Sequence, residues 1–122
     1  MEAEDKIVLV ATHAGEDPER ATLPFVMANA ALVMDTKAVV ALQGSGVWLA
    51  KKGYAEHVFA AGLPPLKDLM KSFLDAGGRL LVCIPCIKER KIAEADLIEG
   101  SETTAAANLL SEILSAKASL TY

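Results

Sequence analysis

The stretch LLVCIPCIKER, residues 80–90, joins an apolar run, the only two cysteines of the chain and a charged segment. The run Arg79 to Cys83 predicts a buried strand, and the charged segment after it predicts a short helix. Cys83 would then lie where the strand ends and face the first amides of the helix, an environment that favours a thiolate. Sulfur chemistry is therefore the first functional hypothesis.

Two other stretches, KIVLVAT at residues 6–12 and KAVVAL at 37–42, are apolar and rich in β-branched residues without a break. Such runs predict strands that are buried on both faces, as in a parallel sheet. A weaker strand signal covers 118–122, and residues 96–100 are expected to form a short strand or a turn.

The first predicted helix runs to about Met34 and has two candidate starts. Either Asp17 caps it with Pro18 in the first turn, or Thr22 caps it with Pro24 in the first turn. The second start is favoured because it keeps Pro24 out of the helix interior.

Three more helices are predicted, at residues 47–52, from 64–65 to about 76, and from about 103 to 116. The glycines at 77–78 would end the middle one. Strands that alternate with helices predict an α/β fold, with a mostly parallel sheet of about five strands covered on both faces. We expect residues 1–122 to form a single domain.

The composition excludes several functional classes. The chain has 122 residues, of which 52% are hydrophobic and 5% aromatic, and its net charge is −4, which argues against a nucleic-acid-binding surface. No apolar run approaches the roughly 20 residues needed to span a bilayer, and the acidic start is unlike a signal peptide. We therefore expect a cytoplasmic protein with reduced thiols.

We expect the candidate site at the predicted carboxyl ends of the strands, because parallel sheets bind their ligands there. Cys83 is the candidate nucleophile, and Cys86 could resolve a sulfenate or persulfide on it as a disulfide. The residues expected to contact a ligand or stabilise charge are His13, Gln43, Gly44, Ser45, Gly46, Trp48, Lys88 and Arg90.

A zinc site is arithmetically possible, since the chain has two cysteines and two histidines. His13 and His57 do not show the short paired spacing of zinc ligands, so we predict no metal and no cofactor.

The order of several short features resembles the DsrE/DsrF-like family over nearly the whole chain. These features are Asp17-Pro18-Glu19 before an alanine-rich helix, Gly44-Ser45-Gly46-Val47 after a strand, the segment Pro65 to Gly77 leading into Leu80-Leu81-Val82-Cys83, and Leu97-Ile98-Glu99-Gly100.

This resemblance implies a three-layer α/β/α fold and assembly as trimers or hexamers. In the sulfurtransferase members a cysteine at a strand end accepts and passes a persulfide, and Cys83 matches that cysteine by position. The chain has Lys91 where those sulfurtransferases tend to have glycine after the arginine.

The leading hypothesis is thus a sulfur-handling protein that carries a persulfide between donor and acceptor proteins. Two alternatives stay open: a module that binds a small ligand or a partner without catalysis, and a peroxiredoxin-like dithiol redox protein that uses both cysteines. The nearly all-apolar first helix predicts a homo-oligomer, because a monomer would expose that surface.

Overall fold

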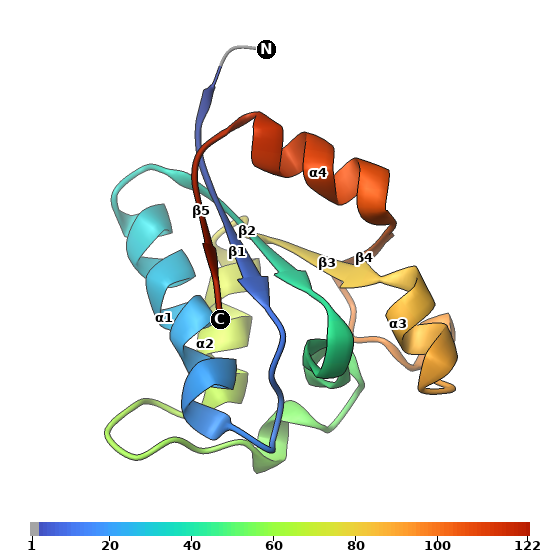
Figure 1. Ribbon diagram of the computed structural model, residues 1–122. Helices are drawn as coiled ribbons and strands as arrows, with labels where there is room; N and C mark the ends of the chain where they lie inside the picture. Colours follow the sequence, from blue (N-terminus) through green and yellow to red (C-terminus); the bar gives the residue numbers. More distant parts are fainter. Residues whose placement is uncertain (1–2) are drawn as a thin grey trace.

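The computed structural model describes residues 3–122 and contains a sheet of five parallel strands (Figure 1). The strands are β1 (Glu4–Ala11), β2 (Lys37–Leu42), β3 (Arg79–Cys83), β4 (Ser101–Thr104) and β5 (Ala116–Thr121). Their order across the sheet is β4-β3-β2-β1-β5, and every pair is parallel. All carboxyl ends therefore meet at one edge.

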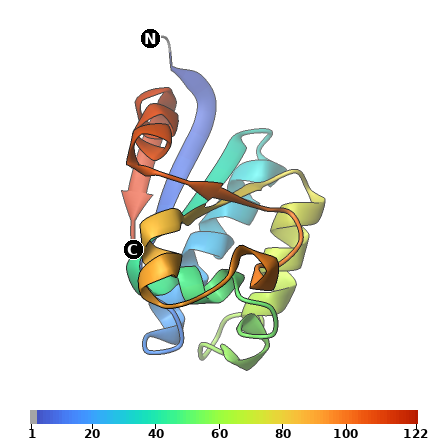
Figure 2. The ribbon, with the colours of Figure 1, turned by 90° about the vertical axis from the view of Figure 1, so that its right-hand side faces the viewer.

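Helices cover both faces of this sheet, which confirms the predicted three-layer fold (Figures 1 and 2). Helices α1 (Pro18–Val33) and α2 (Leu66–Asp75) lie on one face, and α4 (Ala106–Leu114) lies on the other. The short helix α3 (Ile84–Glu89) and the 3₁₀ segments η1 (Gly44–Ala50), η2 (Ala55–His57) and η3 (Glu94–Asp96) connect the strands.

The strands alternate their side chains between two cores, as the pleat requires. Leu9 and its neighbours on one face pack under α1 and α2, where the rings of Phe25 and Phe73 meet edge to face with centroids 5.6 Å apart. On the other face, Val8 and its neighbours pack under Leu109 of α4. Because both faces are buried, β2 and β3 are apolar without alternation, and their predicted bounds are confirmed.

The favoured start of the first helix is wrong. Asp17 caps α1, its side chain accepting a hydrogen bond from the Arg20 N–H at 3.1 Å, and Pro18 occupies the first turn. Thr22 is internal and donates to the Pro18 carbonyl at 2.7 Å, and Pro24 lies buried inside the helix. The Asp17 cap and the burial of this segment therefore outweigh the hydrogen bond that a proline cannot donate.

The helix predicted over 103–116 is also partly wrong. Ser101–Thr104 forms β4, in which Thr103 pairs with Val82 and Thr104 with Cys83, and α4 begins only at Ala106. The two threonines suit an extended backbone, and the sheet provides β3 as their partner.

Three smaller differences concern element bounds. The segment predicted as a helix at 47–52 is the 3₁₀ segment η1, which begins at Gly44. In the stretch predicted as a short strand or a turn, Asp96 ends η3, Leu97 makes an isolated bridge to Lys51, and Glu99 and Gly100 form a turn. Strand β1 starts two residues before the predicted strand, and β5 covers Ala116–Thr121 where 118–122 was predicted. Within the described residues, no helix is long and apolar enough to cross a membrane.

Candidate functional site

Cys83 is the last residue of β3 and the residue directly before α3. It lies opposite Thr104 of β4, and its side chain is half-buried against the core that underlies α1 and α2. The strand end thus presents a free thiol at the edge of the sheet where ligands of parallel α/β folds bind.

Cys86 lies in α3 and is also a free, half-buried thiol. Its Sγ accepts a hydrogen bond from the backbone N–H of Gly44 at 3.3 Å. Gly44 has φ +54, a left-handed conformation that glycine adopts without strain and that follows the end of β2. The contact therefore links α3 to the loop after the neighbouring strand through sulfur.

Burial raises the pKa of the Cys83 thiol above its ordinary value, and a hydrogen bond with the Cys86 side chain raises it further. The Cys86 backbone N–H and the charge of Arg90 lower the pKa of Cys83, but their effect is smaller than that of burial and the Cys86 side chain. This direction is opposite to the one expected from the sequence. The physical reason is that the Cys83 thiol is partly buried and lies near Cys86, whereas Lys88 is exposed to solvent and does not offset these effects.

Arg90 is the cation of the candidate set that engages the cysteine segment. Its guanidinium donates to the carbonyl of Cys86 at 3.1 Å, which holds it at the end of α3. The next residue, Lys91, has φ +57. This is the position where the resembling sulfurtransferases tend to have glycine, and the backbone has the left-handed conformation that glycine would favour.

The glycine-rich loop after β2 is shaped by close backbone approach. Gly46 is buried, its N–H donates to the Gln43 carbonyl at 2.9 Å, and a Cβ at this position would overlap the carbonyl of Ala11 in β1. Gln43 in turn donates its N–H to the Ala11 carbonyl at 3.0 Å, and Ser45 lies half-buried between the two glycines. The loop therefore packs against β1 and brings the Gly44 amide to Cys86.

Trp48 lies half-buried in η1 and stacks on Tyr54, with ring centroids 6.0 Å apart and planes 24° from parallel. The Tyr54 hydroxyl accepts a hydrogen bond from the Gly15 N–H at 2.8 Å. The two rings thus connect η1 to the loop that follows β1.

His13 lies in that loop and pairs with Glu16, with 2.7 Å between Nδ1 and the carboxylate. Burial alone would raise the pKa of Glu16, but the hydrogen bond from the Ala14 N–H and the interaction with His13 together lower it. His13 is therefore held by a carboxylate, and His57 lies exposed in η2. Within residues 3–122, no group of three His, Cys, Asp or Glu side chains could hold a metal ion.

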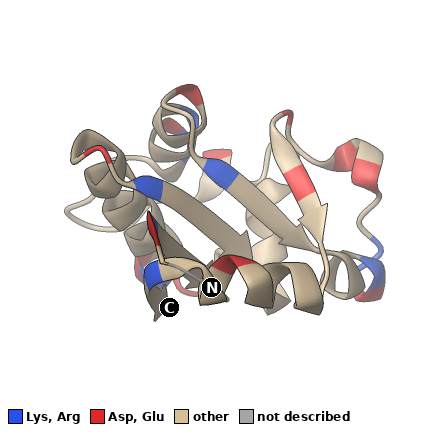
Figure 3. Ribbon diagram, turned by 90° about the horizontal axis from the view of Figure 1, so that it is seen from above, with Lys and Arg blue, Asp and Glu red and all other residues tan. Residues whose placement is uncertain are grey.

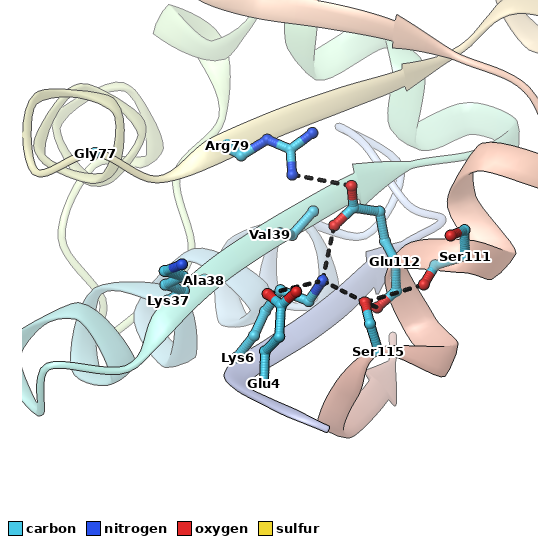
Figure 4. Close-up of a pocket in the computed structure, with 10 residues that line it drawn as sticks. All are labelled: Glu4, Lys6, Lys37, Ala38, Val39, Gly77, Arg79, Ser111, Glu112 and Ser115. Atoms are coloured by element: carbon cyan, nitrogen blue, oxygen red, sulfur yellow. Dashed lines mark hydrogen bonds and ion pairs between the residues drawn. The ribbon is translucent and has the colours of Figure 1, made fainter. Parts of the chain in front are cut away.

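A second polar cluster lies at the opposite edge, where the strands begin (Figure 3). Lys6 of β1 is only 5% exposed, and its ammonium donates to Glu112 at 3.0 Å and to the Ser115 hydroxyl at 2.7 Å. Glu112 of α4 also accepts from Arg79 at 2.9 Å, and Arg79 pairs with Glu102 of β4. Figure 4 shows the Glu112 carboxylate between the two cations, beside a cavity of about 590 Å³.

The hydrogen bonds and ion pairs of this cluster hold α4 against the sheet. Burial by itself raises the pKa of Glu112, yet the bonds and charges of Lys6 and Arg79 outweigh burial and lower it. The carboxylates of Glu102 and Glu112 raise the pKa of Arg79. All buried side-chain polar atoms of the described residues have partners. The cluster is therefore satisfied within the chain, and we read it as structural.

Sequence analysis missed Tyr54, Thr104 and the Lys6 cluster. Tyr54 lies far from the strand ends in sequence, and Thr104 was assigned to a helix. Lys6 carried a usable signal, because a charge inside a run that is buried on both faces needs a partner.

The chain is a parallel α/β domain that carries two neighbouring thiols at the carboxyl edge of its central strands. It belongs to the DsrE/DsrF-like family, whose sequence model matches residues 5–122.

The chain is also similar to several archaeal proteins. It is 32% identical over 97 residues to the uncharacterized protein MJ0989 of Methanocaldococcus jannaschii, covering 80% of this chain and 82% of that protein. It is 33% identical over 98 residues to the uncharacterized protein MK0008 of Methanopyrus kandleri, covering 80% and 78%.

It is 33% identical over 106 residues to the uncharacterized protein MJ0760 of M. jannaschii, where the match covers 87% of this chain but only 38% of the relative. Among solved structures, the ychN protein from E. coli superposes with a TM-score of 0.81 over the full length of both chains at 22% identity, a likeness that concerns the fold.

Proposed function

We propose that this protein carries sulfane sulfur as a persulfide on Cys83 and passes it to an acceptor thiol. The observation that supports the proposal most strongly is the free Cys83 thiol at the carboxyl end of β3 in a DsrE/DsrF-like chain. Family membership points to sulfur-relay chemistry, and the position of the thiol fits a group that a partner protein must reach.

In the proposed step, the Cys83 thiolate attacks the terminal sulfur of a donor persulfide. A new S–S bond forms on Cys83 while the donor's S–S bond breaks, and the donor cysteine leaves as a thiolate. Because burial raises the pKa of Cys83, only a small fraction is ionised near neutral pH, and loading should accelerate as the pH rises. Arg90 favours the anionic forms of Cys83.

A dithiol redox role is the second candidate, and one observation favours it. Cys83 at the end of β3 and Cys86 in the first turn of α3 are both free, half-buried thiols three residues apart. The nearness of Cys86 also raises the pKa of Cys83. A disulfide between them would consume both thiols, whereas the relay needs only Cys83.

We further propose that the protein acts in the cytoplasm, with donor and acceptor proteins as partners, and that it assembles with copies of itself. Val33 and Met34 at the end of α1 are 85% and 75% exposed, which is unusual for large apolar side chains and supports self-association. A trimer or a hexamer is the assembly that the resemblance to the family implies.

The experiment is intact-mass spectrometry of the reduced protein after incubation with a persulfide donor. Wild type, Cys83→Ser and Cys86→Ser are compared, and a carrier gains about 32 Da for each sulfur atom held on its thiol. The proposal expects this gain in wild type and in Cys86→Ser, and its loss in Cys83→Ser.

Two other results would reject the carrier. A loss of two hydrogens that requires both cysteines identifies the dithiol protein. No mass change in any variant leaves the non-catalytic binding module, in which both thiols are bystanders.

A further inference from the structure

Strand β5 forms an open edge of the sheet. It is the last strand in the order β4-β3-β2-β1-β5, and nothing in the described part of the chain lies beyond it (Figure 2). The Tyr122 N–H donates to the carbonyl of Val10 in β1, and the Tyr122 carbonyl accepts from the N–H of Thr12, the residue after β1. Because backbone groups alternate sides along a strand, Ala118 and Leu120 also face β1.

The backbone groups of the remaining residues of β5, namely Lys117, Ser119 and Thr121, therefore point away from the sheet. Their N–H and C=O groups form a ready template for another strand. Natural proteins usually blunt such an edge with charges, prolines or very short strands. The opposite edge, β4, has four residues and carries Glu102. In β5 the only charge is Lys117, and that side chain pairs with Asp5 at 3.3 Å.

An apolar groove runs beside the same edge. A cavity of about 310 Å³ lies between the start of β5 and one stripe of α1. Met27 and Ala30 of α1, and Met34 directly after its last residue, line it at helical spacing together with Ala118 of β5. Met27 is 41% exposed and Leu120 of β5 is 40% exposed. The unpaired backbone groups of β5 and the exposed apolar stripe of α1 thus form one continuous surface.

We propose that this surface binds a second copy of the chain, with the two β5 strands antiparallel about a twofold axis near Ser119. An antiparallel pair centred there would make about six backbone hydrogen bonds and set Lys117 opposite Thr121 of the other copy. Within this strand pair no charge faces a like charge, since Lys117 is the charged residue of β5.

Symmetry also favours a second copy of the chain as the partner of this surface. A twofold contact uses the β5 edge of both chains at once, whereas pairing β5 with a β4 edge would leave an edge open and build a filament. The contact requires an even number of subunits. It is compatible with a hexamer and excludes an isolated trimer, and it does not depend on the proposed sulfur chemistry.

The test compares wild type with Ser119→Pro by multi-angle light scattering and sedimentation. Proline removes the outward N–H of residue 119 without breaking a β1–β5 hydrogen bond, and edge strands tolerate proline. By symmetry two of the proposed hydrogen bonds are lost, so the dissociation constant should rise about 100-fold. The matched control Ser119→Ala keeps the N–H and should retain the wild-type mass.

The expected result is a wild-type assembly with an even number of subunits, and a Ser119→Pro assembly of half that mass. Met34→Lys, at an exposed position on the α1 stripe, should weaken the contact independently and covers the case in which Ser119→Pro misfolds. A monomeric or trimeric wild type would overturn the proposal. So would an unchanged mass in a folded Ser119→Pro and in Met34→Lys.

Discussion

Replacing Gly46 by alanine should destabilise the protein and disturb the cysteine site together. A Cβ on Gly46 would lie 2.9 Å from the carbonyl carbon of Ala11 and overlap its oxygen. Gly46 and Ala11 are both buried, and the opposing atoms belong to the backbone of β1. No rotamer change can relieve this overlap, so η1 must move away from the strand.

Overpacking of this kind costs roughly 1–3 kcal/mol and sometimes more. We expect the upper end, because the clash is with backbone, reduced by about 0.5–1 kcal/mol for the lower entropy of the unfolded chain. The net loss of about 2–3 kcal/mol corresponds to a fall of about 10 °C in Tm for a domain of this size.

Gly53→Ala is the matched control. Gly53 has φ +85 and no atom within 4 Å of an added Cβ, so alanine there costs only backbone strain of about 1–2 kcal/mol, reduced by the same unfolded-state term to a net loss of about 1 kcal/mol or less. Urea unfolding of wild type and both variants, at one protein concentration, measures the difference. If Gly46→Ala loses no more stability than Gly53→Ala, the steric argument fails.

The same variant reports on the site. Movement of η1 should withdraw the Gly44 N–H from the Cys86 sulfur, which is 3.3 Å away in the wild type. Alkylation of Cys86 in Gly46→Ala should therefore be faster than in Gly53→Ala. Equal rates would show that the glycine loop does not position the amide.

Three more changes test other contacts. Lys6→Met should cost about 2 kcal/mol at neutral pH, because it removes a buried charge-assisted hydrogen bond to Glu112. The pKa of Glu112 is lowered in the folded state, so this stabilisation exists above the ordinary carboxyl pKa and is lost as the pH falls; urea midpoints of wild type and Lys6→Met should converge in acid. Lys91→Gly should increase the free energy of unfolding by up to about 1 kcal/mol and so raise the urea midpoint, since residue 91 has a left-handed backbone conformation. Arg90→Gln should slow alkylation of Cys83 about twofold or more at fixed pH, measured by mass spectrometry, because Arg90 lowers the pKa of that thiol.

The sequence predicted the parts of the fold that depend on burial alone. Strands β2 and β3 have both faces covered, so their residues are apolar throughout and their bounds were readable. Strand β4 was missed because it is a short, polar edge strand, SETT, whose extended form depends on its partner β3. The start of α1 was misjudged because buried packing tolerates Pro24 inside the helix.

The candidate site was predictable in location and not in its electrostatics. The position of Cys83 at a strand end follows from a local pattern, and the structure places it as predicted. The direction of its pKa shift depends on burial and on the nearness of Cys86, which are tertiary properties. The contact between Gly44 and Cys86 joins residues 42 positions apart and has no local signal.

The most direct test of the central claim is the rate of sulfur loading on Cys83 as a function of pH. In Cys86→Ser, a persulfide donor is mixed with protein between about pH 7 and pH 10, and the loaded peptide is quantified by mass spectrometry. The account predicts sulfur on the Cys83 peptide, with a rate that still rises above the ordinary thiol pKa of 9.0. No loading at any pH, or equal loading of a variant that lacks Cys83, would contradict it.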